Sequence, residues 1–350
     1  MNTMNDPVRT DGFEFVEYTA PDTRNLEALF LSMGFTPVAR HRSKDVVLYR
    51  QGNINFIINH EPNSFAQAFA KIHGPSVCAF GIRVKNASLA YEHVLKRNAK
   101  PYHGHTGPME LNLPAIRGIG GSLIYLIDLY GDHSIYDVDF RPIVGVGQFP
   151  KGAGLVGIDH LTHNVHKGRM NHWAKFYESL FGFRQIKYFD IHGKETGLRS
   201  RAMTSPCGKI RIPINEPSDE KSQIQEYLDA YRGEGIQHIA LSTNNIYDTV
   251  EVLQNNKITF MDVPDTYYEA ISGRIPGHEE DIARLKANKI LLDGNVRNSQ
   301  GLLLQIFTNT VIGPIFFEII QRKGNEGFGE GNFQALFESI ERDQKQRGVI

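Results

Sequence analysis

The chain repeats its own pattern, and this internal repeat limits the possible folds more than any other feature. Residues 12–35 (GFEFVEYTAPDTRNLEALFLSMGF) and 157–183 (GIDHLTHNVHKGRMNHWAKFYESLFGF) each begin with glycine and a short strand-like run. Each then crosses a polar turn and continues through an amphipathic helix to a Gly-Phe pair. Self-similarity of this kind indicates a fold built from duplicated units.

The repeat continues along both halves of the chain. Residues 77–99 and 236–258 both predict a strand, an asparagine turn and a helix, and residues 120–131 and 313–324 both predict a closing strand. Strand-like runs also follow the first helix of each half, at 46–59 and 209–217. The sequence therefore predicts an α+β chain of tandem β-α-β-β-β modules, two in each half, with strongly curved sheets.

A Gly- and Pro-rich stretch at 141–154 (RPIVGVGQFPKGAG) predicts the linker between the halves. We expect domains at residues 10–143 and 155–350. Each is long enough to bury a core of its own.

The composition excludes several classes of function. The formal net charge of −1 argues against nucleic acid or an anionic membrane as the main partner. No apolar stretch is long enough to span a bilayer, and the polar N-terminal segment lacks the layout of a signal peptide. The two cysteines, Cys78 and Cys207, have neither zinc nor redox spacing. We therefore expect a cytoplasmic protein with reduced thiols.

Glu318 lies inside an apolar run, GPIFFEIIQR (313–322), that is typical of a strand buried on both faces. A buried, unpaired carboxylate is costly, so this residue needs a partner. Aligning the two halves shows polar residues in the second half where the first half has apolar ones: His160 against Phe15, His238 against Phe80, and Glu318 against Leu126.

Two imidazoles and one carboxylate are the ligand set of non-haem Fe(II) centres with open coordination positions. Because the three residues fall on distant strands, a curved sheet is expected to gather them around one cavity. His163 is expected to point to the opposite face of its strand from His160. The remaining histidines of interest have loop, turn or helix-surface contexts: His103, His105, His166, His172 and His192.

Seven short motifs resemble, in order, those of the 4-hydroxyphenylpyruvate dioxygenases of the vicinal oxygen chelate superfamily. They are GIDHLTHNV, PINEP, KSQIQEYL, GIQHIALST, LLLQIF, FFEIIQR and GFGEGNF. The resemblance covers essentially the whole chain and is densest over residues 157–340. It implies oxidative decarboxylation of 4-hydroxyphenylpyruvate by O2, with ring hydroxylation and side-chain migration, to give homogentisate and CO2 in tyrosine and phenylalanine catabolism.

The resemblance also implies Fe(II), one ion per chain, held by His160, His238 and Glu318. It implies catalytic roles for Ser200, Asn215, Gln223 and Gln305. It implies substrate contacts for seven further residues: Pro213, Gln237, Phe307, Phe316, Phe328, Asn332 and Phe333. Residues of these types suit the chemistry, because an aromatic ring needs apolar walls and a phenol needs uncharged hydrogen-bonding partners.

Three alternatives remain open at this point. A hydroxymandelate synthase resembles the same family and uses the same substrate, an extradiol ring-cleaving dioxygenase has the same fold and ligands, and a metal-free binding protein shares the fold alone. The PINEP and GFGEGNF motifs favour the homogentisate-forming enzyme. We also expect a homo-oligomer, a dimer or tetramer.

The tail, residues 327–348, predicts an amphipathic helix with Phe333, Leu336, Phe337 and Ile340 on one face. Asn332 precedes this run and is expected to cap the helix. We expect the helix to act as a lid over the metal cavity, since the reaction requires that water be kept away.

Overall fold

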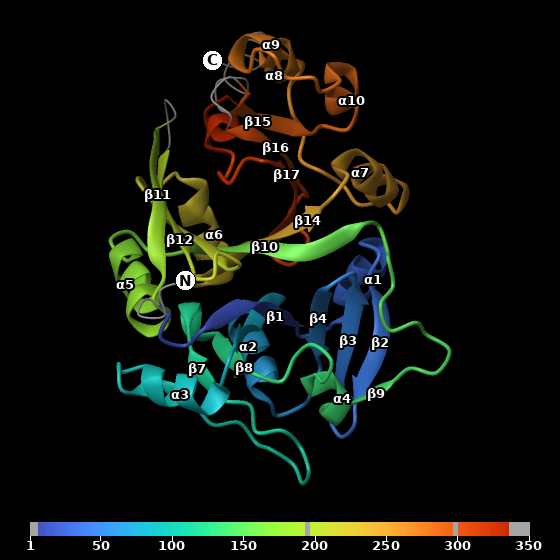
Figure 1. Ribbon diagram of the computed structural model, residues 1–350, viewed down its shortest axis with the longest axis vertical. Helices are drawn as coiled ribbons and strands as arrows, with labels where there is room; N and C mark the ends of the chain where they lie inside the picture. The colour runs from blue at the N-terminus through green and yellow to red at the C-terminus, as the bar shows by residue number, and fades with distance from the viewer. Residues whose placement is uncertain (1–5, 193–196, 297–299, 336–350) are drawn as a thin grey trace.

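The computed structural model describes residues 6–192, 197–296 and 300–335. Within these residues the chain forms two curved sheets, one from each half (Figure 1). The first sheet has nine strands and the second has eight.

The first half contains two successive β-α-β-β-β modules. The first module is β1 (Thr10–Thr19), α1 (Arg24–Ser32), β2 (Thr36–His41), β3 (Val46–Gln51) and β4 (Ile54–Asn59). After α2 (Phe65–His73) comes the second: β5 (Ser76–Val84), α3 (Ala87–Leu95), β6 (Pro101–Tyr102), β7 (Ala115–Arg117) and β8 (Leu123–Ile127). A short 3₁₀ turn, η2 (Ile119–Gly121), precedes β8, and α4 (Ile135–Asp139) and β9 (Phe140–Pro142) follow it.

The second half repeats this order. Its first module is β10 (Leu155–Asn164), α5 (Met170–Phe181), β11 (Arg184–His192), β12 (Gly197–Thr204) and β13 (Arg211–Pro217). After α6 (Gln223–Tyr231) come β14 (Gly235–Thr243), α7 (Ile246–Asn255), β15 (Leu291–Asn295), β16 (Gly301–Phe307) and β17 (Phe316–Lys323). Three short helices separate α7 from β15: α8 (Asp265–Glu269), α9 (Ile271–Arg274) and α10 (Ile282–Ala287).

The modules predicted from the repeat are therefore confirmed. The asparagine turns in the repeated segments also have a clear local role, because Asn86 caps α3 and Asn245 caps α7 through their side chains. The change from one sheet to the other falls between Pro142 and Leu155. The division into domains at 10–143 and 155–350 stays a prediction.

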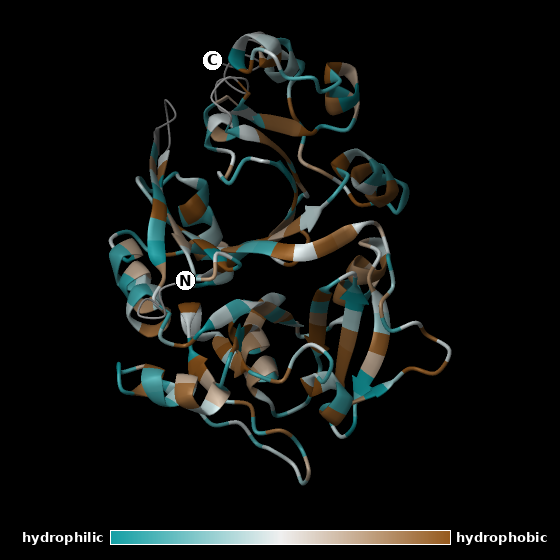
Figure 2. Ribbon diagram, in the orientation of Figure 1, coloured by the Kyte–Doolittle hydropathy of each residue, from teal (hydrophilic) through white to brown (hydrophobic). Residues whose placement is uncertain are grey.

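Each sheet joins its two modules through the first strand of each. β1 pairs antiparallel with β5, and β10 pairs antiparallel with β14. The order in the second sheet is β11-β12-β13-β10-β14-β17-β16-β15, which curves into a half-barrel in Figure 1. In Figure 2 the helices carry hydrophobic and hydrophilic stripes side by side, as expected for helices that cover one face of a sheet.

One hydrophobic core extends through both halves of the molecule. Across the contact between them, Phe56 of β4 stacks on Phe317 of β17, and His73 of α2 stacks on Tyr231 of α6. In the part of the chain that the structure describes, no helix is both long and apolar enough to cross a membrane. Cys78 and Cys207 are both free thiols, as the sequence predicted.

The strand register corrects part of the alignment between the halves. In the second sheet, Ala240 pairs with both His160 and Glu318. In the first sheet, Gly81 takes this place and pairs with Phe15 and Tyr125. The counterparts of His238 and Glu318 are therefore Ala79 and Tyr125, one residue away from the predicted Phe80 and Leu126.

Candidate functional site

Three adjacent strands of the second sheet place His160, His238 and Glu318 on one face. β14 lies between β10 and β17, and its residue Ala240 pairs with His160 on one side and with Glu318 on the other. His238 precedes Ala240 by two residues, so its side chain points to the same face of β14. Because the three strands are hydrogen-bonded neighbours in one sheet, the backbone holds the three side chains close together.

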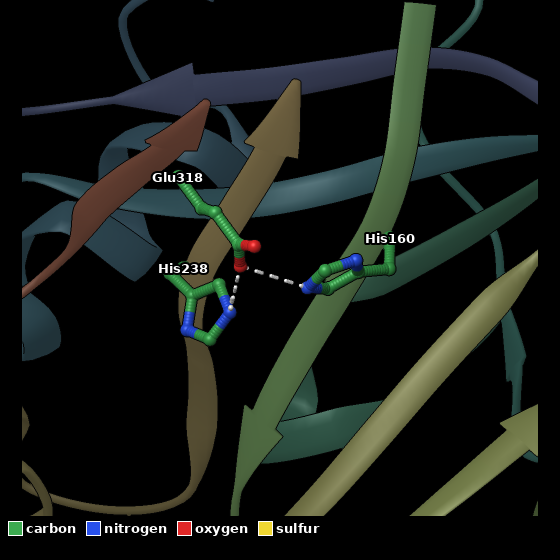
Figure 3. Close-up of side chains that lie close together, drawn as sticks. All are labelled: His160, His238 and Glu318. Carbon is green, nitrogen blue, oxygen red and sulfur yellow. Dashed lines mark ion pairs between the residues drawn. The ribbon is translucent and has the colours of Figure 1, made fainter. Parts of the chain in front are cut away.

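The three side chains converge on one point (Figure 3). Nε2 of His160 lies 3.2 Å from Oε2 of Glu318, and Nε2 of His238 lies 3.3 Å from the same oxygen. One ligand atom from each residue falls within 4.8 Å of the others. All three residues are buried, and Glu318 is only 3 % exposed.

The donor set suits a divalent cation. Oε1 of Glu318 is buried and has no hydrogen-bond partner among the described residues, although such an atom ordinarily has one. Burial opposes ionisation of Glu318, but the His160 imidazolium charge and hydrogen bonds from both imidazoles outweigh it and lower the pKa to about 2. A divalent cation would take the place of these imidazole protons, since two neutral imidazoles with one carboxylate form a facial ligand set with open positions.

A buried ion pair orients His160. Nδ1 of His160 lies 2.8 Å from the Asp159 carboxylate, which accepts two hydrogen bonds of 2.8 Å from the Arg322 guanidinium. The Arg322 and His160 partners outweigh burial and hold the pKa of Asp159 well below its usual range. When Nδ1–H donates to a carboxylate, the lone pair of Nε2 is free for a metal ion.

His238 has weaker support from its neighbours. Its Nδ1 lies 3.1 Å from Oε1 of Gln237, and the Thr162 hydroxyl lies 2.9 Å from its Nε2. Its ring also stacks on Phe316, with the centroids 4.9 Å apart.

The three candidate ligands open into a cavity of about 240 Å³. Nine of the pocket residues expected from the sequence line it: Ser200, Pro213, Asn215, Gln223, Gln237, Phe307, Phe316, Phe328 and Phe333. Aromatic rings lie next to the candidate ligands. Phe328, for example, packs edge-on to His160 with the centroids 5.4 Å apart. Uncharged polar groups lie on β12, β13 and α6, where Ser200 pairs with Asn215 across the two strands.

Gln305 and Asn332, the other two expected pocket residues, lie behind the cavity wall. Nδ2 of Asn332 donates to Oε1 of Gln305 over 3.4 Å, and both residues are 1 % exposed. Nε2 of Gln305 has no hydrogen-bond partner among the described residues. This pair connects β16 to the tail segment, and its predicted catalytic and substrate-binding roles stay predictions.

The start of the tail helix differs from the prediction. Residues 330–335 are already helical, and residues 336–348, including Leu336, Phe337 and Ile340, lie outside the described chain. Asn332 is inside the helix and does not cap it, because its Oδ1 accepts a 2.6 Å hydrogen bond from the Tyr267 hydroxyl. The sequence could not show this, since Tyr267 belongs to the helical insertion between β14 and β15.

The remaining histidines lie apart from the three ligands. His163 points away from the cavity, as expected, and its Nε2 lies 2.7 Å from the Tyr177 hydroxyl of α5. Burial lowers its pKa to about 3. His105 lines a different cavity in the first half of the molecule.

Comparisons with known proteins agree with this geometry. Residues 4–141 match the family model described as "Hydroxyphenylpyruvate dioxygenase, HPPD, N-terminal", and residues 157–272 match the "Glyoxalase/Bleomycin resistance protein/Dioxygenase superfamily". A 4-hydroxyphenylpyruvate dioxygenase of Pseudomonas aeruginosa is 58 % identical over 347 residues, covering 98 % of this chain and 97 % of that protein. The chain belongs to the 4-hydroxyphenylpyruvate dioxygenase family.

This family membership confirms the resemblance, and two further proteins extend the comparison. Hemolysin VllY of Vibrio vulnificus is 60 % identical over 349 residues, covering 98 % of each chain. The solved structure of a triple mutant of 4-hydroxymandelate synthase from Streptomyces coelicolor matches with a TM-score of 0.82 at 22 % identity, covering 97 % of this chain and 99 % of that one. At that identity the match shows the shared fold alone, which is the tandem-module fold expected.

Several residues of the cavity beside the candidate metal ligands were not predicted from the sequence. Seven more residues line the cavity: Thr162, Phe189, Leu198, Ile224, Met261, Asp262 and Glu330. Thr162 could have been found, because it lies two residues from His160 on the same face of a strand. Asp159 and Arg322 carried no local signal, since their contact depends on the pairing of distant strands.

Proposed function

We propose that this protein is an Fe(II)-dependent 4-hydroxyphenylpyruvate dioxygenase that forms homogentisate and CO2 from 4-hydroxyphenylpyruvate and O2. The observation that carries the proposal is the convergence of His160, His238 and Glu318 at one end of a largely aromatic cavity. Identity of 58 % over nearly the full length to a protein named for this activity supports it.

His160, His238 and Glu318 would hold one Fe(II). When bound, the ion supplies coordination for the carboxylate and keto oxygens of the 2-oxo acid and a position for activating O2. Two neutral imidazoles and one carboxylate leave positions open for these ligands. The Arg322–Asp159 pair keeps Nε2 of His160 aimed at the ion.

The chain's own residues orient the rest of the substrate. Phe316, Phe328 and Phe333 provide apolar walls for the ring. At the polar side, Nδ2 of Asn215 donates to Oδ1 of Asn164 over 3.4 Å, which leaves Oδ1 of Asn215 to accept from the phenol. Ser200 and Gln223 offer further uncharged partners, so the phenol keeps its proton.

Exclusion of water is the third contribution of the chain. The cavity lies inside a curved sheet, and Phe328 covers it beside His160. A reactive centre that is shielded in this way loses less oxidising power to side reactions. We propose that the tail segment from residue 327 onward acts as the lid.

The test is the product formed by the purified, Fe(II)-loaded protein with 4-hydroxyphenylpyruvate in air. Homogentisate, identified by chromatography, supports the proposal. Predominant 4-hydroxymandelate would overturn it in favour of the benzylic hydroxylation of a hydroxymandelate synthase. An extradiol enzyme would instead open the ring of a catechol, and a metal-free binding protein would form no product. The homo-oligomeric state and the cytoplasmic location stay predictions.

A further inference from the structure

The first half of the molecule contains a second cavity, of about 160 Å³, inside its own curved sheet. Phe15 of β1 and Tyr125 of β8 line it, and they occupy the positions of His160 and Glu318 in the second half. The fold has therefore kept the space of the metal cavity in the half that lacks the candidate ligands.

Polar groups inside this cavity have incomplete hydrogen bonding. Glu17 lines the cavity at 8 % exposure, and its Oε1 accepts a 2.7 Å hydrogen bond from Nδ2 of Asn59. No cation lies within ion-pair distance of Glu17 in the described chain. Tyr125, whose hydroxyl is a second polar group, also lines the cavity. A space that served only to pack a barrel would be expected to have apolar walls or satisfied polar ones.

The remaining walls are largely apolar. Among the lining residues are Val46, Ile57, Leu113, Ile135 and Phe140. Phe15 and Tyr125 form an aromatic pair whose centroids are 5.7 Å apart. A cavity of roughly 150 Å³ is known to accept a single benzene ring, so the size suits one aromatic ring.

A loop covers the cavity and is held by an ion pair and by hydrogen bonds, including those from Arg42 to the Met109 carbonyl and from the Leu111 amide to Asp139. Residues 104–106 and 110–113 line the space, and the Lys44 ammonium binds the Glu110 carboxylate over 2.7 Å. Lys44 also donates to the carbonyl of His105, and the Gly107 amide donates to Glu110. This loop has little regular structure of its own, so it can open at modest cost.

The charges lining the cavity select against anions. Three carboxylates line it, of which Glu110 is paired with Lys44 and Asp139 with Arg42, so that Glu17 is the one without an ion-pair partner among the described residues. A carboxylate ligand such as a 2-oxo acid would approach Glu17 without a compensating cation. A hydroxyl or amino group, in contrast, can donate to Glu17 and hydrogen-bond the Tyr125 hydroxyl.

We propose that this cavity is a second small-molecule site, which binds a single aromatic ring bearing a hydroxyl or amino donor and no carboxylate. The ring packs against the Phe15–Tyr125 pair on one side and the aliphatic walls on the other, and its donor reaches Glu17. The site is separate from the candidate metal cavity and selects a different ligand chemistry.

Fluorine NMR titration of the full chain with 4-fluorophenol tests the proposal. We expect saturable binding that weakens about tenfold in Tyr125→Phe and in Glu17→Gln. The first variant removes the hydroxyl partner, and the second replaces a charged acceptor with a weaker, neutral amide. A tenfold change corresponds to about 1.4 kcal/mol. Product formation from 4-hydroxyphenylpyruvate should be unchanged in both variants. 3-Fluoro-4-hydroxyphenylacetate, which keeps the fluorine and the phenol and adds a carboxylate, should not bind at this site.

A matched variant separates the two cavities. Asn215 lines the candidate metal cavity, so Asn215→Ala should leave the binding of 4-fluorophenol beside Tyr125 unchanged. The proposal would be overturned if only Asn215→Ala lost binding. It would also be overturned if binding were as strong in Tyr125→Phe and Glu17→Gln as in the wild type. Absence of binding at millimolar 4-fluorophenol would overturn it as well. A crystal soaked with 4-fluorophenol should show the ring in this cavity, against the Phe15–Tyr125 pair.

Discussion

At the scale of single residues, Glu318 determines what the second half can do. Its carboxylate is ionised and buried, yet one of its oxygens has no hydrogen-bond partner in the described chain. A buried carboxylate oxygen without a hydrogen-bond partner is unfavourable by about 1–3 kcal/mol or more. A cation at the point where the two imidazoles converge removes this penalty and explains the position of all three residues.

The first prediction removes one candidate ligand. His160→Ala should lower bound Fe(II) from one ion per chain to close to none and abolish product formation, because two protein ligands hold the ion far more weakly than three. Metal quantitation after desalting measures this. The exposed His166→Ala is the control and should retain both metal and activity. Two tightly bound ions in the wild type, or full iron in His160→Ala, would contradict it.

A second prediction concerns the partner of His160. Asp159→Asn removes the carboxylate that holds Nδ1 and leaves the Arg322 charge without its partner. Metal affinity should fall about 10–100-fold, as is typical when the group that orients a ligand is lost. A competition titration with a chelator measures the affinity. Gln237→Ala, beside His238, is the comparison. An unchanged affinity in Asp159→Asn would show that the sheet alone orients His160.

A third prediction follows from His163. Its folded pKa, about 3, lies below its ordinary value, so below pH 6.5 the unfolded chain binds a proton that the folded chain does not. Stability from this group is therefore present above pH 6.5 and is lost as pH falls toward 3. As the pH falls from 7.5 to 5.5, this group should lower the free energy of unfolding by about 1.4 kcal/mol.

Urea unfolding of the wild type and of His163→Gln at the two pH values measures this contribution. Between the two pH values the free energy of unfolding should fall by about 1.4 kcal/mol more in the wild type than in the variant, because the variant cannot titrate at this position. Equal losses in the two proteins would show that the imidazole does not stay neutral in the fold.

Residue-level reasoning from the sequence found the three candidate ligands but misplaced two of their counterparts. His160, His238 and Glu318 were visible because a polar residue interrupts an apolar strand. Register was not visible, because the sequence does not show which residue of β5 corresponds to a given residue of β14, and the pairings of both strands contain shifts. A shift of one residue turns a side chain to the other face of a strand. The alignment therefore gave Phe80 and Leu126, where the sheet has Ala79 and Tyr125.

At the scale of elements, the sequence predicted the repeated modules well. Amphipathic periodicity and asparagine caps are local signals, so the helices and strands followed from them. The insertion α8–α10 had no counterpart in the first half and could not be placed. Its effect is large, because Tyr267 of α8 and Arg274 of α9 anchor Asn332 of the tail segment.

The fourth prediction tests this anchor. Asn332→Ala removes the acceptor of the 2.6 Å hydrogen bond from Tyr267 and the contact with Gln305. The tail segment should then cover the cavity less completely, so O2 consumption should exceed homogentisate formation. An oxygen electrode and chromatography give the ratio. Gln334→Ala, on the exposed side of the same helix, is the control. A ratio of one in Asn332→Ala would show that the segment merely packs against the core.

At the scale of the whole molecule, the two halves share one core. The turn η2 of the first half lies against the start of β14, the strand that carries His238. Gly120 in this turn has a φ of +57°, and a side chain there would collide with the carbonyl oxygen of Glu234. The first half thus contributes to the position of a strand that the candidate metal centre needs.

The last prediction compares two neighbouring glycines of this turn. Gly121 also has positive φ, at +82°, but a Cβ there would meet no atom within 4 Å. Gly121→Ala should cost only the backbone strain, roughly 1–2 kcal/mol. Gly120→Ala should cost more, because it must also push Glu234 and the start of β14 away, and it should weaken metal binding by displacing His238. Urea unfolding and metal titration of both variants measure this. If the two substitutions had equal effects on stability and on metal affinity, the halves would not be coupled through this contact.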